Sequence, residues 1–169
     1  MGVAASWNAG VSEALIQGAE FVTLCSTSIR FTDGGEQLCD IADFCIENTQ
    51  WPWGFESLNG WHLITLGAVT LELVGEFDEN YYPAYYEDCD YVHRMRLAGI
   101  LEPKGSDRDD RKIPWVPTLK YPCSDAATIA AGLIAPDWEE IRDYHERKWG
   151  CRNGGEEIYT TPFGGKKNE

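Results

Sequence analysis

The 169-residue sequence has little positive charge. Fourteen lysines and arginines stand against 28 aspartates and glutamates, which gives a formal net charge of −14 and a pI near 4.5. A surface this acidic repels phosphate backbones and anionic lipid headgroups. We therefore expect no nucleic-acid partner and no binding to anionic membranes.

Long apolar runs are missing as well. The longest weakly polar stretch covers residues 126–136, and a bilayer span needs roughly 20 apolar residues. The sequence opens with no basic group and no long apolar stretch, so no signal peptide is indicated. We expect no membrane span, and a cytoplasmic protein or one that is part of an assembled particle.

Signatures of a metal site are scarce. None of the six cysteines forms a CxxC pair, and the three histidines are widely scattered. Zinc sites usually show close pairs of such ligands. The sequence therefore predicts reduced, mostly buried thiols and no metal ligands.

The chain does contain enough apolar and aromatic residues for one folded domain, at 43% and 12%. The pattern around Val11, Leu15 and Gly18 predicts a helix that ends at the glycine. The apolar run Phe21–Cys25 predicts a central strand buried on both faces. Asp33 and Glu36 form a capping box before a helix whose buried stripe includes Leu38, Ile41, Ala42 and Cys45.

Further along, the pattern predicts an aromatic loop over residues 51–55 and a strand over residues 62–65, while residues 66–74 fit either a strand or a helix. Two later helices are clearer. One begins near Glu87 and ends at Gly99, and the other begins after the capping residue Asp137 and ends at Gly150. The tail that follows, residues 151–169, is expected to fray.

Alternating helices and short strands indicate an α/β layer structure with helices packed on a small mixed sheet. Ligands of open α/β sheets bind beyond the carboxyl ends of the strands. The polar loop of Ser26, Thr27 and Ser28 follows the predicted central strand, so it is a candidate ligand loop.

Residues 75–91 hold six carboxylates among several aromatic rings. Helical spacing groups Asp88 with Val92 and Met95, which predicts that Asp88 lies on the buried side of its helix. A carboxylate in the first helical turn stays ionised and suits a general base. The alternative is structural, because acidic residues collect at helix N-termini in any case.

These residues resemble the family 2 glycosyltransferases of the GT-A fold. The family pattern G-x-F-D-E matches residues 75–79, and its E-D-x-D block matches residues 87–90, followed by Arg94 and a closing Ala98-Gly99. Asn8-Ala9-Gly10 is similar to the N-x-G of the family, and residues 148–150 are similar to a K-W-G-G tail. The resemblance implies a truncated, Rossmann-like GT-A domain over residues 1–150, with a C-terminal tail at 151–169.

The resemblance also implies inverting transfer of a sugar from a nucleotide-sugar to an acceptor hydroxyl of a glycan or protein. Asp88 would take the acceptor proton, and Glu87 would contact the acceptor or hold the loop. The remaining residues would contact substrate or brace the carboxylates: Trp61, His62, Tyr86, Asp90 and Arg94.

Two departures from the family pattern matter. Ser28 stands where the family has a metal-binding Asp, and hydroxyls are poor ligands for a hard cation. The family's downstream His is also absent from residues 120–125. We expect Mn²⁺ or Mg²⁺ to bind only if a complementing chain supplies ligands.

The second departure is the absence of the family's N-terminal nucleotide-binding half. This predicts a protein partner or a homo-oligomer that covers the exposed edge. Two classes of function remain open. One is a glycosyltransferase that needs a complementing chain, and the other is non-catalytic reuse of the fold as a binding or assembly subunit.

Overall fold

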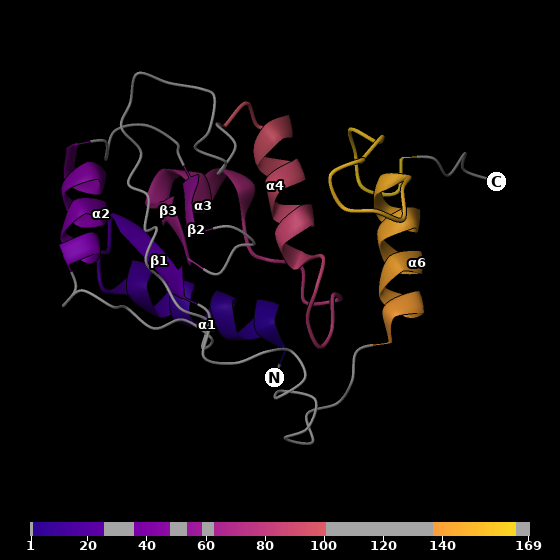
Figure 1. Ribbon diagram of the computed structural model, residues 1–169, viewed down its shortest axis with the longest axis horizontal. Helices are drawn as coiled ribbons and strands as arrows, with labels where there is room; N and C mark the ends of the chain where they lie inside the picture. Colours follow the sequence, from indigo (N-terminus) through magenta and orange to yellow (C-terminus); the bar gives the residue numbers. More distant parts are fainter. Residues whose placement is uncertain (1, 26–35, 48–53, 59–62, 101–136, 165–169) are drawn as a thin grey trace.

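The computed structural model describes residues 2–25, 36–47, 54–58, 63–100 and 137–164. Its strands form a three-stranded sheet in the order β1-β3-β2, and both pairs are antiparallel. The strands are β1 (Phe21–Cys25), β2 (Gly54–Leu58) and β3 (Leu63–Gly67) (Figure 1). The chain is therefore mixed α/β as expected, but the prediction of a mixed sheet is wrong for the described strands, which are all antiparallel.

The strand β1 was expected at the centre of the sheet and lies at an edge of the three described strands. Its neighbour β3 occupies the centre, and all five of its residues are buried. In β1 only Leu24 is buried, and Cys25 is exposed. The prediction was wrong because a short apolar run has the same sequence pattern in a central strand and in an edge strand that a helix covers.

The helix α1 (Val3–Ile16) begins earlier than the apolar pattern indicates and ends as predicted, with Gly18 in a left-handed conformation at φ 85°. It packs through Trp7, Val11 and Leu15 against the hydrophobic core. The core joins the sheet to α1, α3 and α4 and consists of nine buried residues: Ala4, Leu24, Ile64, Leu66, Leu71, Phe77, Tyr91, Met95 and Ile100.

The ambiguous stretch over residues 66–74 contains both structures. The strand β3 ends at Gly67, and α3 (Ala68–Val74) begins at the next residue. The prediction of an aromatic loop over residues 51–55 is wrong for residues 54 and 55, because β2 begins at Gly54. Residues 51–53 lie outside the described part of the chain.

The helix α2 (Glu36–Glu47) buries Ile41 and Cys45, two members of the predicted stripe. Its expected capping residue, Asp33, lies outside the described residues. The helices α4 (Glu87–Leu97) and α6 (Trp138–Trp149) have the predicted starts. Asp137 accepts hydrogen bonds from the backbone N–H groups of residues 139 and 140, which confirms it as the cap.

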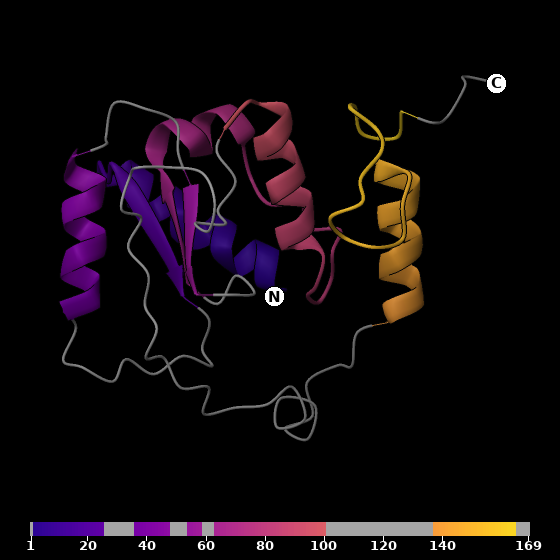
Figure 2. The same ribbon diagram turned by 45° about the horizontal axis from the view of Figure 1, so that its top comes forward.

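In both views α4 lies between the sheet and α6 (Figures 1 and 2). Residues 151–164 fold back onto α6, so the expectation of a fraying tail is wrong for this part. The backbone N–H groups of Ile158 and Tyr159 donate to the carbonyl of Trp149, and that of Phe163 donates to the carbonyl of Lys148. Gly150 permits the turn, because its φ is 84° and a Cβ there would lie 2.9 Å from the Tyr159 ring.

No helix within the described ranges is both long enough and apolar enough to cross a bilayer.

Candidate functional site

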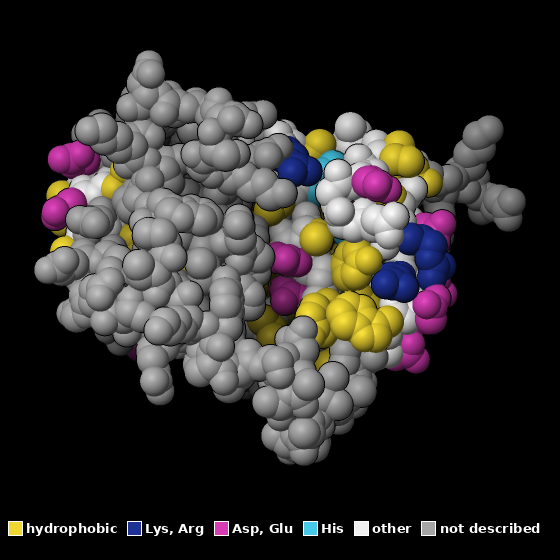
Figure 3. All heavy atoms as spheres, viewed as in Figure 1, with side chains coloured by type: hydrophobic (Ala, Val, Ile, Leu, Met, Phe, Trp, Pro, Cys, Tyr) yellow, Lys and Arg dark blue, Asp and Glu magenta, His cyan; other side chains and the backbone are white. Residues whose placement is uncertain are grey.

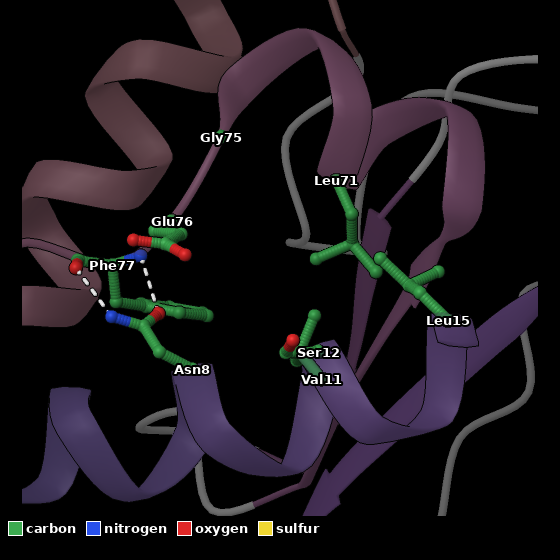
Figure 4. Close-up of a pocket in the computed structure, with 8 residues that line it drawn as sticks. All are labelled: Asn8, Val11, Ser12, Leu15, Leu71, Gly75, Glu76 and Phe77. Carbon is green, nitrogen blue, oxygen red and sulfur yellow. Dashed lines mark hydrogen bonds between the residues drawn. The ribbon is translucent and has the colours of Figure 1, made fainter. Parts of the chain in front are cut away.

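Asn8 joins α1 to the segment that follows α3. Its side-chain Nδ2 donates to the carbonyl of Phe77 at 2.9 Å, and its Oδ1 accepts from the Phe77 N–H at 2.8 Å (Figure 4). The carboxamide thus satisfies both backbone polar groups of the buried residue Phe77, as a neighbouring β-strand would. A small cavity of about 160 Å³ lies beside this contact, between α1 and α3, with Val11, Leu15 and Leu71 among its lining residues.

Asp78 accepts two short hydrogen bonds from α6. Lys148 Nζ and Tyr144 Oη each lie 2.6 Å from Asp78 Oδ2. Partial burial alone would raise the pKa of Asp78, but the bonds from Lys148 and Tyr144 outweigh it and lower the pKa to about 2. Asp78 is therefore an anion that holds α6 in place.

Asp90 is the last carboxylate of the E-D-x-D block, and its side chain has no exposed surface. Its Oδ2 accepts from Arg94 Nε at 2.9 Å. Its Oδ1 lies 2.7 Å from Trp149 Nε1 and 2.5 Å from Lys148 Nζ. A buried carboxylate with this many donors is compensated for its burial, so in the described conformation Asp90 is saturated by the protein itself.

Arg94 reaches beyond its ion pair with Asp90. Its Nη1 donates to the carbonyl of Val74 at 2.7 Å, and its Nη2 donates to the carbonyl of Glu76 at 2.9 Å. The guanidinium thus fixes the segment after α3 against α4. This geometry agrees with a bracing role for Arg94.

Glu87 is the first residue of α4 and is 6% exposed. Its Oε2 is buried and has no hydrogen-bond partner among the described residues. Burial, with a further contribution from the neighbouring Asp88 charge, raises the pKa of Glu87 to about 7. Near neutral pH this carboxyl can therefore both hold and release a proton.

Asp88 is half-buried, and its Oδ1 accepts from the backbone N–H of Cys89 at 2.8 Å. The prediction that Asp88 lies on the buried face of α4 is wrong, since the buried residues are Glu87, Asp90, Tyr91, His93 and Met95. Tyr91 decides the orientation of the helix, because its ring is fully buried and stacks on Phe77 with centroids 4.1 Å apart. Figure 3 shows one face of the molecule. Near the middle of this face, acidic side chains (magenta) lie beside hydrophobic ones (yellow).

The turn before α4 has an unusual backbone. Tyr85 and Tyr86 have φ values of 84° and 69°, which residues other than glycine seldom adopt. Tyr86 Oη donates to the carbonyl of Arg152 at 2.8 Å, and the Tyr85 ring lies 4.2 Å from that of Trp138. Contacts with the α6 segment therefore hold this turn, and such strain is characteristic of functional sites.

The structure brings part of the predicted site together. Glu87, Asp88, Asp90 and Arg94 share α4, and Tyr86 directly precedes it. Ser26, Thr27, Ser28, Trp61 and His62 lie outside the described residues, so their predicted roles remain predictions.

The sequence alone indicated no role for Asp78, Tyr144 or Lys148, although Asp78 and Lys148 lie in family-like motifs. One signal pointed to such a role. Asp78 and Asp90 flank aromatic residues in a segment that must be largely buried, and buried carboxylates require a cation. The K-W-G motif supplies that cation through Lys148.

The arrangement leaves two adjacent carboxylates for chemistry. Within the described residues, Lys148 and Arg94 neutralise Asp78 and Asp90, whereas no cation pairs with Glu87 or Asp88. The same part of the chain contains no group of three metal-ligand side chains that includes Glu87 or Asp88. The pair is thus suited to proton transfer.

Comparison with known proteins gives one short match. A 34-residue stretch of the chain is 59% identical to a galactofuranosyl glycosyltransferase from Leishmania donovani, and it covers 20% of this chain and 8% of that protein. No protein-family model matches the chain, and no solved structure matches it. The match relates a short stretch of this chain to a glycosyltransferase.

Proposed function

We propose that this chain is a glycosyltransferase-like protein of the family 2, GT-A type, which takes part in inverting transfer of a sugar from a nucleotide-sugar to an acceptor hydroxyl. The match to a galactofuranosyl glycosyltransferase supports the reaction class and makes galactofuranose a first donor sugar to test. A second protein chain, or a second copy of this one, supplies the rest of the donor site. Any Mn²⁺ or Mg²⁺ depends on ligands from that partner.

The observation that carries the proposal is the sorting of the carboxylates around α4. Lys148 and Arg94 compensate Asp78 and Asp90, so the four charged groups form a rigid support. The support positions the start of α4, where Glu87 and Asp88 stand side by side. Rigid placement of a base is what makes general-base catalysis effective, at roughly 10²- to 10⁴-fold in rate.

Asp88 is the base in this proposal. The acceptor O–H gives its proton to an Asp88 oxygen while the acceptor oxygen forms a bond to the anomeric carbon, and the bond to the nucleoside diphosphate breaks. Asp88 is half-buried and can therefore meet an acceptor, whereas Glu87 is 6% exposed. Glu87 shapes the site and keeps its proton up to near neutral pH.

The proposal assigns positioning roles to Asp90 and Arg94. From the sequence, both were expected to contact substrate or to brace the carboxylates. Asp90 has no exposed side-chain surface, and three neighbouring atoms already bind it: Arg94 Nε, Lys148 Nζ and Trp149 Nε1. Substitution of either residue would act through Glu87 and Asp88. Tyr86 stays at the rim of the site as a substrate-contacting residue.

The test is the Asp88→Asn substitution, because Asn keeps the shape of the side chain and cannot take a proton. Transfer is measured with a panel of radiolabelled UDP-sugars that includes UDP-galactofuranose, on the protein purified together with its natural partners. We expect at least a 10²-fold loss of transfer for Asp88→Asn and a smaller loss for Glu87→Gln. Asp43→Asn, an exposed carboxylate on α2, is the matched control and should retain full transfer.

Unchanged transfer by Asp88→Asn would remove this residue from the mechanism. Absence of transfer by the wild-type assembly with every donor in the panel would favour the alternative function, in which the fold serves as a non-catalytic binding or assembly subunit.

A further inference from the structure

A second cluster of reactive side chains lies where residues 151–164 fold back onto α6. His145 comes from α6, and Cys151 and Glu157 come from the segment after it. Each residue offers one ligand atom, and these three atoms lie within 4.8 Å of one another. They are a ring nitrogen of His145, the thiol sulfur of Cys151 and a carboxylate oxygen of Glu157. No other group of three such side chains occurs in the residues that the structure describes.

The cluster is buried and incompletely satisfied. The side chains of His145 and Glu157 are 0% and 1% exposed, and Cys151 is 9% exposed. His145 Nε2 and Glu157 Oε2 are both buried without a hydrogen-bond partner in the described part of the chain. His145 Nε2 is 3.4 Å from Glu157 Oε1, but the contact lacks the geometry of a hydrogen bond. Buried polar atoms without partners are rare in folded proteins, and a bound water or ion is one explanation for them.

The surroundings orient these ligands. His145 Nδ1 lies 2.8 Å from Tyr81 Oη, which fixes the ring and leaves Nε2 directed at the cluster. Glu157 Oε1 accepts from the Gly155 N–H at 2.7 Å. A partner on the second ring nitrogen and a hydrogen-bonded carboxylate are typical of metal sites. Arg96 Nη1, at 3.7 Å from Glu157 Oε2, is the nearby cation and balances part of the carboxylate charge.

We propose that His145 Nε2, Cys151 Sγ and Glu157 form a buried structural site for a divalent zinc-type cation. Nitrogen, thiolate and carboxylate ligands together suit Zn²⁺ better than Mg²⁺ or Mn²⁺, which prefer oxygen ligands. Bond lengths of about 2.0–2.3 Å place tetrahedral ligands about 3.3–3.8 Å apart, so each pair of ligand atoms needs to approach by at most about 1.5 Å. Zn²⁺ binding converts the Cys151 thiol to a thiolate and releases its proton to solvent.

Cys89 of α4 does not belong to the group of three, but its thiol lies near the same loop, so we treat it as the candidate fourth ligand. Its sulfur lies against Gly154, in the loop between Cys151 and Glu157, and a Cβ at position 154 would overlap it. The loop therefore sits directly against α4. A cation bound by His145, Cys151 and Glu157 would fix the segment after α6 to α6, and its burial keeps it away from substrate. The role is structural and does not depend on the proposed sugar transfer.

The test uses the full chain, prepared under reducing conditions and stripped with a chelator, and titrated with Co²⁺ and then with Zn²⁺. Co²⁺ bound to a thiolate gives a charge-transfer band in the near ultraviolet and tetrahedral bands in the visible range. We expect one Co²⁺ per chain, displacement of Co²⁺ by Zn²⁺, and a higher melting temperature with metal. Cys151→Ser should abolish the charge-transfer band and lower the affinity at least tenfold.

Cys39→Ser is the matched control, because Cys39 is an exposed thiol on α2, and it should keep the full signal. Glu157→Gln has a nearly unchanged shape and serves as the test variant if Cys151→Ser does not fold. It should also weaken binding at least tenfold. Cys89→Ser loses intensity from the band if Cys89 is the fourth ligand and leaves it unchanged if a water takes that position. The proposal is overturned if the wild type shows no thiolate band, or if Cys151→Ser and Glu157→Gln bind Co²⁺ as the wild type does.

Discussion

Lys148 Nζ lies 2.5 Å from Asp90 and 2.6 Å from Asp78, so a single ammonium group joins two carboxylates from different parts of the chain. One carboxylate precedes α4 and the other belongs to it, while the lysine lies near the end of α6. The pair of contacts explains how a charged helix can pack against a strongly acidic segment. Removal of Lys148 would therefore take away a cation that two largely buried carboxylates share.

Substitution of Lys148 by Met should destabilise the protein by about 3–5 kcal/mol, since it leaves buried carboxylates without their shared cation. The free energy of unfolding in urea measures the effect. Arg147→Met, one position earlier in α6, removes an exposed cation and should have a much smaller effect. Adding Asp78→Asn to Lys148→Met should recover part of the loss, and no recovery would argue against direct pairing of Lys148 with Asp78.

Substitution of Asn8 by Ala should cost about 1–3 kcal/mol for each polar group of Phe77 that it leaves unsatisfied. Asn8→Asp should also destabilise, because a carboxylate cannot donate to the Phe77 carbonyl. Urea unfolding is again the measurement. Ser12→Ala, one turn later on α1, is the control and should unfold like the wild type. Equal stability of Asn8→Ala and Ser12→Ala would show that the carboxamide contacts do not contribute.

The raised pKa of Glu87 predicts a pH dependence of stability. The pKa of a glutamate rises from an ordinary value of 4.5 to about 7 in the folded protein, so between these values the folded state binds more protons than the unfolded state. Stability from this group is therefore present below about pH 4.5 and is lost as the pH rises towards 7, by on the order of 3 kcal/mol at most.

Glu87→Gln tests this dependence, because Gln resembles the protonated form at every pH. We expect the variant to match the wild type near pH 5 and to exceed its stability at pH 8. The difference between the two urea midpoints, followed from pH 4.5 to 8, isolates Glu87 from all other titrating groups. A difference that does not change with pH would mean that Glu87 titrates normally.

The lowered pKa of Asp78 predicts the opposite sign. Its pKa of about 2 lies below the ordinary value of 3.8, so its stabilisation is present above pH 3.8 and is lost as the pH falls towards 2. Tyr144→Phe removes the 2.6 Å hydrogen bond to Asp78. The variant should lose about 1.5–3 kcal/mol at neutral pH and unfold at a higher pH on acidification.

Circular dichroism during acid titration measures this shift. Tyr82→Phe is the control, since Tyr82 is 52% exposed. An identical acid midpoint for Tyr144→Phe and Tyr82→Phe would contradict the role of Tyr144 in holding the pKa of Asp78 down.

The elements with local signals were predictable from sequence. Asp137, Gly99 and Gly150 mark the helix ends through caps and left-handed turns, which depend only on neighbouring residues. The order of the strands was not predictable, because pairing of β1 with β3 joins residues some forty positions apart, such as Thr23 and Thr65. No local pattern encodes that choice.

The orientation of α4 shows a second limit. The residues 88, 92 and 95 fit a helical stripe, and so do Glu87, Tyr91 and Met95. The second stripe is the buried one, because the Tyr91 ring stacks on the ring of Phe77. That partner comes from the fold and cannot be read from the spacing. The same holds for Lys148, whose role depends on carboxylates far away in the chain.

The bond from Lys148 to Asp78 spans 70 positions of the sequence. During synthesis both carboxylates leave the ribosome well before their cation, so the packing of α4 remains electrostatically incomplete until α6 has been made. Domains generally fold as units once their contacts are available. A nascent chain that stops short of Lys148 should therefore stay open around α4, and the synthesis of α6 completes the packing of this region.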